Sequence, residues 1–184
     1  MSLPKTYLQL LSTVKADGEL IMELVERDMP TPGPDEVVLR VEAAPINPSD
    51  QSVMLGASLR DKVTTSGSGA RTKLTGPIPA QGMRAMKARV GQPLPIGNEG
   101  SGTVVAAGEN AQALMGNLVA VMSGGMYGQY RLVKAAMCLP LGPDHTAKDG
   151  AACFVNPLTS LSMLETMRIE GHTALVHTAA ASNL

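Results

Sequence analysis

The sequence is poor in aromatic residues and cysteine. Among its 184 residues are one phenylalanine, three tyrosines, no tryptophan and two cysteines. Cys138 and Cys153 lack the close spacing of a metal-binding pair and suit a reduced compartment, so we expect a cytoplasmic protein without a disulfide scaffold. No apolar run reaches the length of a bilayer span, and no basic-then-apolar signal region opens the sequence. We therefore expect no membrane partner.

The net charge of −1 gives no reason to expect a nucleic-acid partner, but the charge is unevenly distributed. Residues 51–96 contain seven basic residues and one acidic residue, whereas the remainder has 8 basic and 15 acidic residues. Within this stretch, a segment from about 56 to 92 breaks the surrounding pattern with a Ser/Gly run at 65–69 and a helical pattern at 80–90.

This basic segment has two interpretations. Its loop composition favours a solvated, partly disordered flap. Alternatively, Arg84, Lys87 and Arg89, which lie off the apolar face of the helical pattern, line the mouth of a cleft and attract a phosphate-bearing or carboxylate substrate.

The other residues before position 140 predict short strands joined by tight turns. Apolar or alternating runs occur at 7–14, 20–25, 36–44, 102–108, 117–122 and 128–133. The turn at 45–50 precedes a helix with Ser49 or Asp50 near its N-cap. Frequent glycines between short strands are typical of a barrel-like β domain. We therefore predict a mainly β fold.

Past residue 140 the pattern changes to two helices, at 146–152 and 157–167. They are followed by a buried strand at 174–177 and a turn of small residues at 179–184. A strand that runs into such a turn is typical of the opening of a dinucleotide-binding domain. We expect a first domain over 1–140, including the insertion at about 56–92, and the start of a truncated cofactor domain over 141–184.

Five segments, in this order and spacing, together resemble the medium-chain dehydrogenase/reductase superfamily. They are Pro32–Ala44, Asn47–Asp50, Pro95–Val105, Gly128–Tyr130 and Asn156–Thr159. The resemblance implies a GroES-like β-barrel catalytic domain, two following helices and the first strand of a Rossmann α/β domain. It also implies an active site in the cleft between the two domains and, for the complete protein, a homodimer.

The metal ligands of the zinc-dependent members are missing. The resemblance places Asn47 where those members have a cysteine and Asn98 where they have a histidine. Amides are poor zinc ligands beside thiolate and imidazole, and two cysteines cannot form the four-cysteine structural zinc lobe. We therefore expect no zinc.

Without zinc, the resemblance implies an NAD(P)H-dependent oxidoreductase of the quinone-reductase kind. It transfers hydride to a small-molecule quinone or to an activated carbonyl or alkene. Asn47 is the expected catalytic residue at the nicotinamide end of the cleft. The alternative for Asn47 is an Asx turn that orders the corner before Pro48. Asn98 is a candidate substrate contact, with the three cations of the insertion.

The expected cofactor is NADPH, although NADH stays open. The segment around Asn156 and Thr159 is most similar to the 2-enoyl-thioester reductases, in which the residue matching Asn156 contacts NADPH and the residue matching Thr159 lies near the pyrophosphate. The alternative makes Asn156 a helix N-cap before Pro157. The dinucleotide-binding turn would consist of Ala181, Ser182, Asn183 and Leu184. Because most of the cofactor site would follow this turn, we expect the isolated chain to be inactive.

Two other functions stay open. An enoyl-thioester (enoyl-CoA or ACP) reductase would use a tyrosine between the corner and Asn98, but residues 51–98 contain none. The chain could also be a non-catalytic interaction module that kept the fold. This function would explain the missing tyrosine. It would also explain Asn183, which stands where a glycine is usual in the dinucleotide-binding turn.

The first prediction concerns metal content. Purified, tag-free protein should contain no stoichiometric zinc, because amides occupy both ligand positions of the zinc-dependent branch. Elemental analysis measures this directly. A ratio near one zinc per chain would show that the sequence has been misinterpreted.

Overall fold

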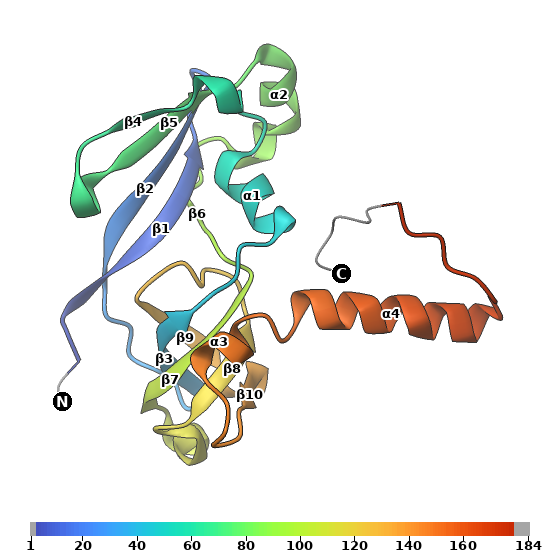
Figure 1. Ribbon diagram of the computed structural model, residues 1–184. Coiled ribbons are helices and arrows are strands. Elements are labelled where there is room, and N and C mark those ends of the chain that lie inside the picture. Colours follow the sequence, from blue (N-terminus) through green and yellow to red (C-terminus); the bar gives the residue numbers. More distant parts are fainter. Residues whose placement is uncertain (1–2, 179–184) are drawn as a thin grey trace.

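A computed structural model describes residues 3–178 as two five-stranded antiparallel sheets with four α-helices (Figure 1). The first sheet contains β4 (Thr64–Ser66), β5 (Lys73–Pro77), β2 (Glu19–Asp28), β1 (Thr6–Val14) and β6 (Leu94–Pro95), in that spatial order. The second contains β10 (Cys138–Pro140), β8 (Leu118–Met122), β7 (Glu99–Ala107), β3 (Glu36–Ala43) and β9 (Tyr130–Lys134).

The α-helices are α1 (Pro48–Leu55), α2 (Ala80–Ala85), α3 (Ala147–Ala151) and α4 (Val155–Glu170). Of these, α3 packs against β7, β8 and β3 of the second sheet, and α1 lies against β1 and β2 of the first. Short 3₁₀ turns occur at η1 (Arg60–Lys62), η2 (Gly69–Arg71), η3 (Lys87–Arg89), η4 (Glu109–Leu114) and η5 (Ala135–Met137). The predicted mainly β fold is confirmed, and all six strand predictions for the first 140 residues correspond to observed strands.

The two sheets join along β1 and the segment before β9. Gln9 forms an isolated antiparallel bridge with Gly128. The backbone N–H of Leu10 donates to Tyr127, and that of Gln129 donates to Leu8, at 2.8 and 2.9 Å. These bonds satisfy backbone groups that an open sheet edge would expose, and they close the barrel-like arrangement.

Each sheet has its own apolar core, because alternate residues along a strand point to the same face of the sheet. The larger core, on the second sheet, contains Val37, Leu39, Val104, Ala111, Val119, Val121, Met126 and Val133. The smaller core, on the first sheet, contains Val14, Leu20 and Ile78, with Ala57, Met83, Met86 and Val90 packed against it. The insertion therefore supplies most of the smaller core.

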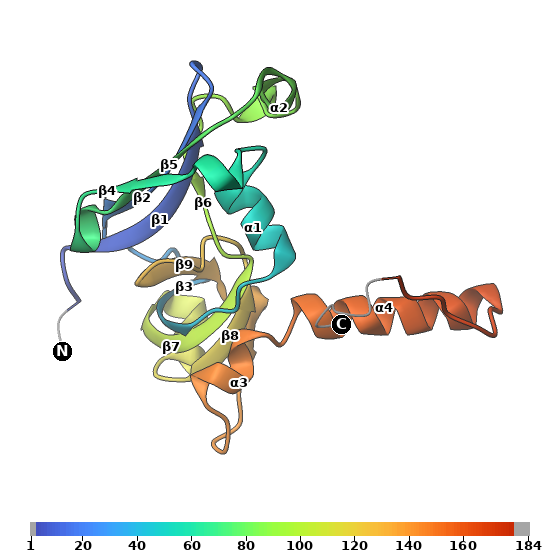
Figure 2. The ribbon, with the colours of Figure 1, turned by 45° about the horizontal axis from the view of Figure 1, so that its top comes forward.

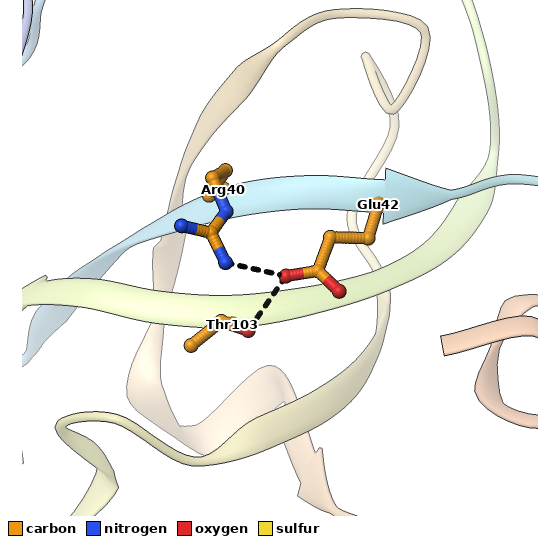
Figure 3. A network of polar contacts seen from close by, with 3 residues as sticks. All are labelled: Arg40, Glu42 and Thr103. Carbon is orange, nitrogen blue, oxygen red and sulfur yellow. Dashed lines mark hydrogen bonds and ion pairs between the residues drawn. The ribbon is translucent and has the colours of Figure 1, made fainter. Parts of the chain in front are cut away.

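Arg40, Glu42 and Thr103 form a polar network on β3 and β7 (Figure 3). Glu42 on β3 accepts hydrogen bonds from Thr103 on β7, at 2.7 Å, and from Arg40, at 2.9 Å. The hydrogen bond from Thr103 and then that from Arg40 hold the pKa of Glu42 below its ordinary value. Because the side chains of Arg40 and Glu42 are 53% and 34% exposed, water screens this ion pair and it contributes little to stability.

The basic segment at 56–92, interpreted above as a solvated, partly disordered flap, contains paired strands and helical turns. Residues 73–77 form β5, which pairs with β2 along five residue pairs, and β4 pairs with β5 in turn. Lys73 lies directly opposite Glu23, and their side chains approach to 2.6 Å. The acidic β2 therefore neutralises part of the basic segment. The helical pattern at 80–90 forms α2 and η3, with Met83 and Met86 on the core side as predicted.

The side chain of Arg89 contacts α1 and β1, and its role as a substrate contact stays a prediction. Its guanidinium donates to the carbonyl of Val53, near the C-terminal end of α1, at 3.2 Å. It also donates to the backbone carbonyl of Ser12, at 3.4 Å, and to the Ser12 hydroxyl, at 3.1 Å. Partial burial lowers the pKa of Arg89. Carbonyls at the end of a helix lack intrahelical donors, so a cation there is favourable. Arg89 thus anchors the insertion to α1 and β1.

The helix α4 extends away from both sheets in the two views (Figures 1 and 2). It has no buried residue, and Leu164 is 60% exposed. The strand predicted at 174–177 is not formed, because a strand needs a neighbouring edge and this segment has none in the described part of the chain. Val176 is 86% exposed. Within residues 3–178, no helix combines the length and apolarity that a membrane crossing requires.

The second prediction concerns the Arg89 anchor. Arg89→Met should lower the free energy of unfolding by about 2 kcal/mol, because it removes charge-assisted hydrogen bonds at a partly buried site. Arg84→Met is the matched control: Arg84 is an exposed arginine on α2, and its removal should change stability by less than about 0.5 kcal/mol. Urea unfolding followed by circular dichroism measures both. Equal effects would contradict an anchoring role.

Candidate active site

The corner at 45–50 is held by a buried carboxylate. Asn47 is the N-cap of α1 and Pro48 is its first residue, so the cap lies two or three positions before the predicted Ser49 or Asp50. Asp50 accepts the backbone N–H of Asn47 at 2.8 Å with one oxygen and the backbone N–H of Asn98 at 2.9 Å with the other. Asp50 is 1% exposed. It thus joins the corner to the segment before β7.

The side chain of Asn47 points to a second buried carboxylate. Its Nδ2 donates to Oε1 of Glu99 at 2.9 Å. Asn47 is 4% exposed and Glu99 is 1% exposed. The other oxygen of Glu99, Oε2, accepts the backbone N–H groups of Phe154 and Val155, both at 2.9 Å. One carboxylate therefore joins the corner to the start of α4.

Asn98 lies on the solvent side of this network. Its Nδ2 donates to the hydroxyl of Ser49 at 2.8 Å. Asn98 is half-buried and Ser49 is exposed. The structure thus brings together Asn47 and Asn98, two of the five predicted site residues of the β domain, through hydrogen bonds with Ser49, Asp50 and Glu99.

This donor set does not suit a metal ion. The described residues contain no cluster of three His, Cys, Asp or Glu side chains that could hold one. The Asn47 amide turns its NH₂ group, which has no lone pair to offer, toward Glu99. The prediction of a zinc-free protein stays a prediction, and this geometry supports it.

The predicted cofactor residues occupy the first turns of α4. Asn156 is the second residue of the helix rather than its N-cap, because Glu99 caps the helix from β7. The Thr159 hydroxyl donates to the carbonyl of Val155 at 2.6 Å. Both side chains are half-buried or exposed, so each keeps an accessible surface. Ala181, Ser182, Asn183 and Leu184 lie outside the described residues.

The cations of the insertion do not join the corner. The guanidinium of Arg89 contacts the far end of α1. Arg84 and Lys87 belong to α2 and η3, and Figure 2 shows α2 beyond the end of α1 that is opposite the corner. No hydrogen bond within residues 3–178 links any of the three to Asn47 or Asn98.

Sequence reasoning missed Tyr127. Its hydroxyl donates to the carbonyl of Pro45 at 2.7 Å, although 82 residues separate the two. Burial, followed by the nearby charge of Asp50, raises the pKa of Tyr127 above its ordinary value. The phenol therefore stays neutral and holds the corner at Pro45. Only its position in the loop before β9 brings it there, so no local sequence signal could have found it.

The fold and this corner define the catalytic-domain class of the medium-chain dehydrogenases and reductases. Residues 33–143 match the model of the alcohol dehydrogenase GroES-like domain family, and the chain belongs to that family. A solved structure from Mesorhizobium loti, provisionally assigned as an NADPH:quinone reductase, is 30% identical with a TM-score of 0.69. The match covers 100% of this chain and 50% of that protein.

Two further solved structures share the fold at lower identity. A provisionally assigned NADPH:quinone reductase from Bacillus thuringiensis is 20% identical with a TM-score of 0.62, over 90% of this chain and 42% of that protein. The Escherichia coli quinone oxidoreductase in complex with NADPH is 18% identical with a TM-score of 0.58, over 88% of this chain and 41% of that protein. The chain thus spans half or less of the length of these structures. No curated protein matches it.

The third prediction concerns Gly97, which directly precedes Asn98. Its φ is +97°, and a Cβ there would lie 2.7 Å from the backbone nitrogen of Tyr127. Gly97→Ala should therefore cost about 3 kcal/mol, from backbone strain together with overpacking. Gly124→Ala is the control, since Gly124 also has a positive φ, +70°, but faces open space. It should cost about 1 kcal/mol. Thermal unfolding measures both, and equal losses would refute the packing argument.

Proposed function

We propose that this chain is the substrate-side half of a zinc-independent, NADPH-dependent oxidoreductase that reduces a quinone or another activated carbonyl or alkene. The observation that carries the proposal is the hydrogen bond from Asn47 to Glu99. The resemblance places Asn47 where the zinc-dependent members have a cysteine ligand, and its amide instead donates to Glu99, which supports a corner that needs no ion. The assignment of the Mesorhizobium loti protein as an NADPH:quinone reductase supports the cofactor and the substrate class.

The chemistry requires a hydride and a proton. Bound NADPH would supply the hydride. The chain must then align the substrate and offer hydrogen bonds to the negative charge that develops on the substrate oxygen. Ser49 is suited to this, because its exposed hydroxyl accepts a bond from Asn98 and keeps its own proton free to donate. Asn47 orders the corner from which Ser49 projects.

The residues of α4 fit a cofactor in part. Glu99 already occupies the N–H groups of Phe154 and Val155, so these cannot bind a pyrophosphate. The accessible side chains of Asn156 and Thr159 remain for NADPH, and the Thr159 oxygen can still accept a hydrogen bond. Cofactor binding by residues 181–184, a homodimer and a cytoplasmic location remain part of the proposal.

A quinone or carbonyl substrate is favoured over an enoyl thioester. The phenol nearest the corner, that of Tyr127, already donates its proton to Pro45. It is therefore not free to protonate a substrate carbon. This observation weakens the alternative of an enoyl-thioester reductase.

The fourth prediction tests the proposed function in the full-length protein that contains this chain. NADPH should be oxidised when a quinone is added, and a strong chelator should leave the rate unchanged. Asn47→Ala should lower kcat roughly 10- to 100-fold, because the corner that presents the hydrogen-bond donors loses its order. The measurement is the decay of NADPH fluorescence, analysed separately for kcat and KM.

Glu42→Gln is the control, since Glu42 is an exposed glutamate whose two side-chain hydrogen bonds involve no residue of the corner. It should leave kcat unchanged. Loss of turnover with the chelator would refute the metal-free mechanism. A variant Asn47→Ala with unchanged kcat and lower thermal stability would assign Asn47 to the turn alone.

A further inference from the structure

The burial of Glu99 needs an explanation that the proposed reaction does not give. An ionised carboxylate that is 1% exposed is costly unless donors compensate it. No ion pair in the described part of the chain includes Glu99. Its compensation comes from three N–H donors: the Asn47 amide on Oε1 and two backbone amides of the α4 start on Oε2.

The start of α4 depends on this carboxylate. The N-cap residue Phe154 makes no side-chain cap bond, and the first turn of the helix contains no acidic residue. The first N–H groups of a helix have no partner within the helix, and they carry the positive end of its dipole. Glu99, 55 residues earlier in the sequence, satisfies two of them. Because α4 buries no residue, packing against the sheets contributes little to its position.

The same carboxylate fixes the orientation of Asn47. A carboxylate can only accept, so the amide must turn its NH₂ group toward Glu99. The distance of 2.9 Å and the burial of both groups leave no room for a water between them. The corner and the helix therefore share one rigid connection.

We propose that Glu99 is a positioning residue that locks α4 to the Asn47 corner, so that the residues on α4 and those on the corner keep one relative geometry. The inference rests on the proposed function, because Asn156 and Thr159 on α4 are its proposed cofactor contacts and the corner presents its substrate contacts. Glu99 itself is enclosed and contacts neither substrate nor cofactor.

Amide hydrogen exchange at residues 154 and 155 tests the connection in the 184-residue chain. Glu99→Gln keeps the shape but replaces the charged acceptor by a neutral amide, which can still accept from the N–H groups of α4 only if the Asn47 amide turns over to offer its oxygen. Exchange at 154 and 155 should become about 10- to 100-fold faster, as expected for the loss of hydrogen bonds to a charged group. Glu42→Gln, on the exposed face of β3, should leave these rates unchanged.

A second substitution should rescue the first. In the double variant Asn47→Asp/Glu99→Gln, the new carboxylate at position 47 would accept from the new amide at position 99. The oxygen of that amide would accept from the N–H groups at the start of α4. Amide exchange at residues 154 and 155 should return to within about twofold of the parent rate. A difference of that size is about the error expected when the effects of two substitutions are combined. In the full-length enzyme, kcat should fall in Glu99→Gln and recover in the double variant, which loss of stability alone would not produce.

Unchanged exchange at 154 and 155 in Glu99→Gln, or no rescue by Asn47→Asp, would overturn the proposal. So would a kcat that does not follow the exchange rates. If Glu99→Gln does not fold, the double variant decides: recovery of a folded chain with protected amides supports the connection, and failure to fold refutes it. A further outcome is that the parent and the variants show the expected exchange rates while the full-length parent does not oxidise NADPH. That result would refute the proposed function and leave the connection between Glu99 and α4 intact.

Discussion

The arrangement of the corner depends on a single buried charge, that of Glu99. A carboxylate at 1% exposure must find donors, and here all three come from segments distant in sequence: Asn47 before α1, and Phe154 and Val155 at the start of α4. Such bonds are stronger than neutral ones, and their loss would leave the charge without compensation. Burial of Glu99 therefore requires the corner and α4 to occupy fixed places, and Asp50 repeats the arrangement by accepting the backbone N–H groups of Asn47 and Asn98.

The insertion acts on the same corner from the opposite end of α1. Arg89 donates to the carbonyl of Val53, and Ser12 donates to the carbonyl of Met54, so the C-terminal end of the helix is held by partners from two other segments. At the N-terminal end, Asp50 accepts the backbone N–H of Asn98, which lies on the segment before β7. A short helix with both ends fixed in this way cannot pivot without breaking charge-assisted bonds. The basic segment is thus part of the framework of the site, even though its cations do not face the corner.

The features that the sequence predicted are those with a local signal. Alternating apolar residues identified β1, β3 and β7, and the apolar face with Met83 and Met86 identified the helix of the insertion. β5 escaped prediction because Gly76 and Pro77 are poor strand residues, and its pairing is supplied by β2. The start of α4 was misplaced because its cap, Glu99, is 55 residues away. Asn47 and Asn98 were singled out from the resemblance to a known family, whereas their contacts with Glu99 and Asp50 are non-local and could be seen only in the structure.

The residue at position 47 decides how the charge of Glu99 is balanced. A thiolate there would add a second negative charge beside a buried carboxylate, and such a pair requires a cation to be stable. An amide instead contributes a donor, so the charge of Glu99 is compensated by Asn47 and the positive end of α4. The corner then needs no ion for its own stability. Charge that develops on a bound substrate must accordingly be stabilised by hydrogen-bond donors, and the exposed hydroxyl of Ser49, which accepts from Asn98, is the donor that this corner offers to solvent.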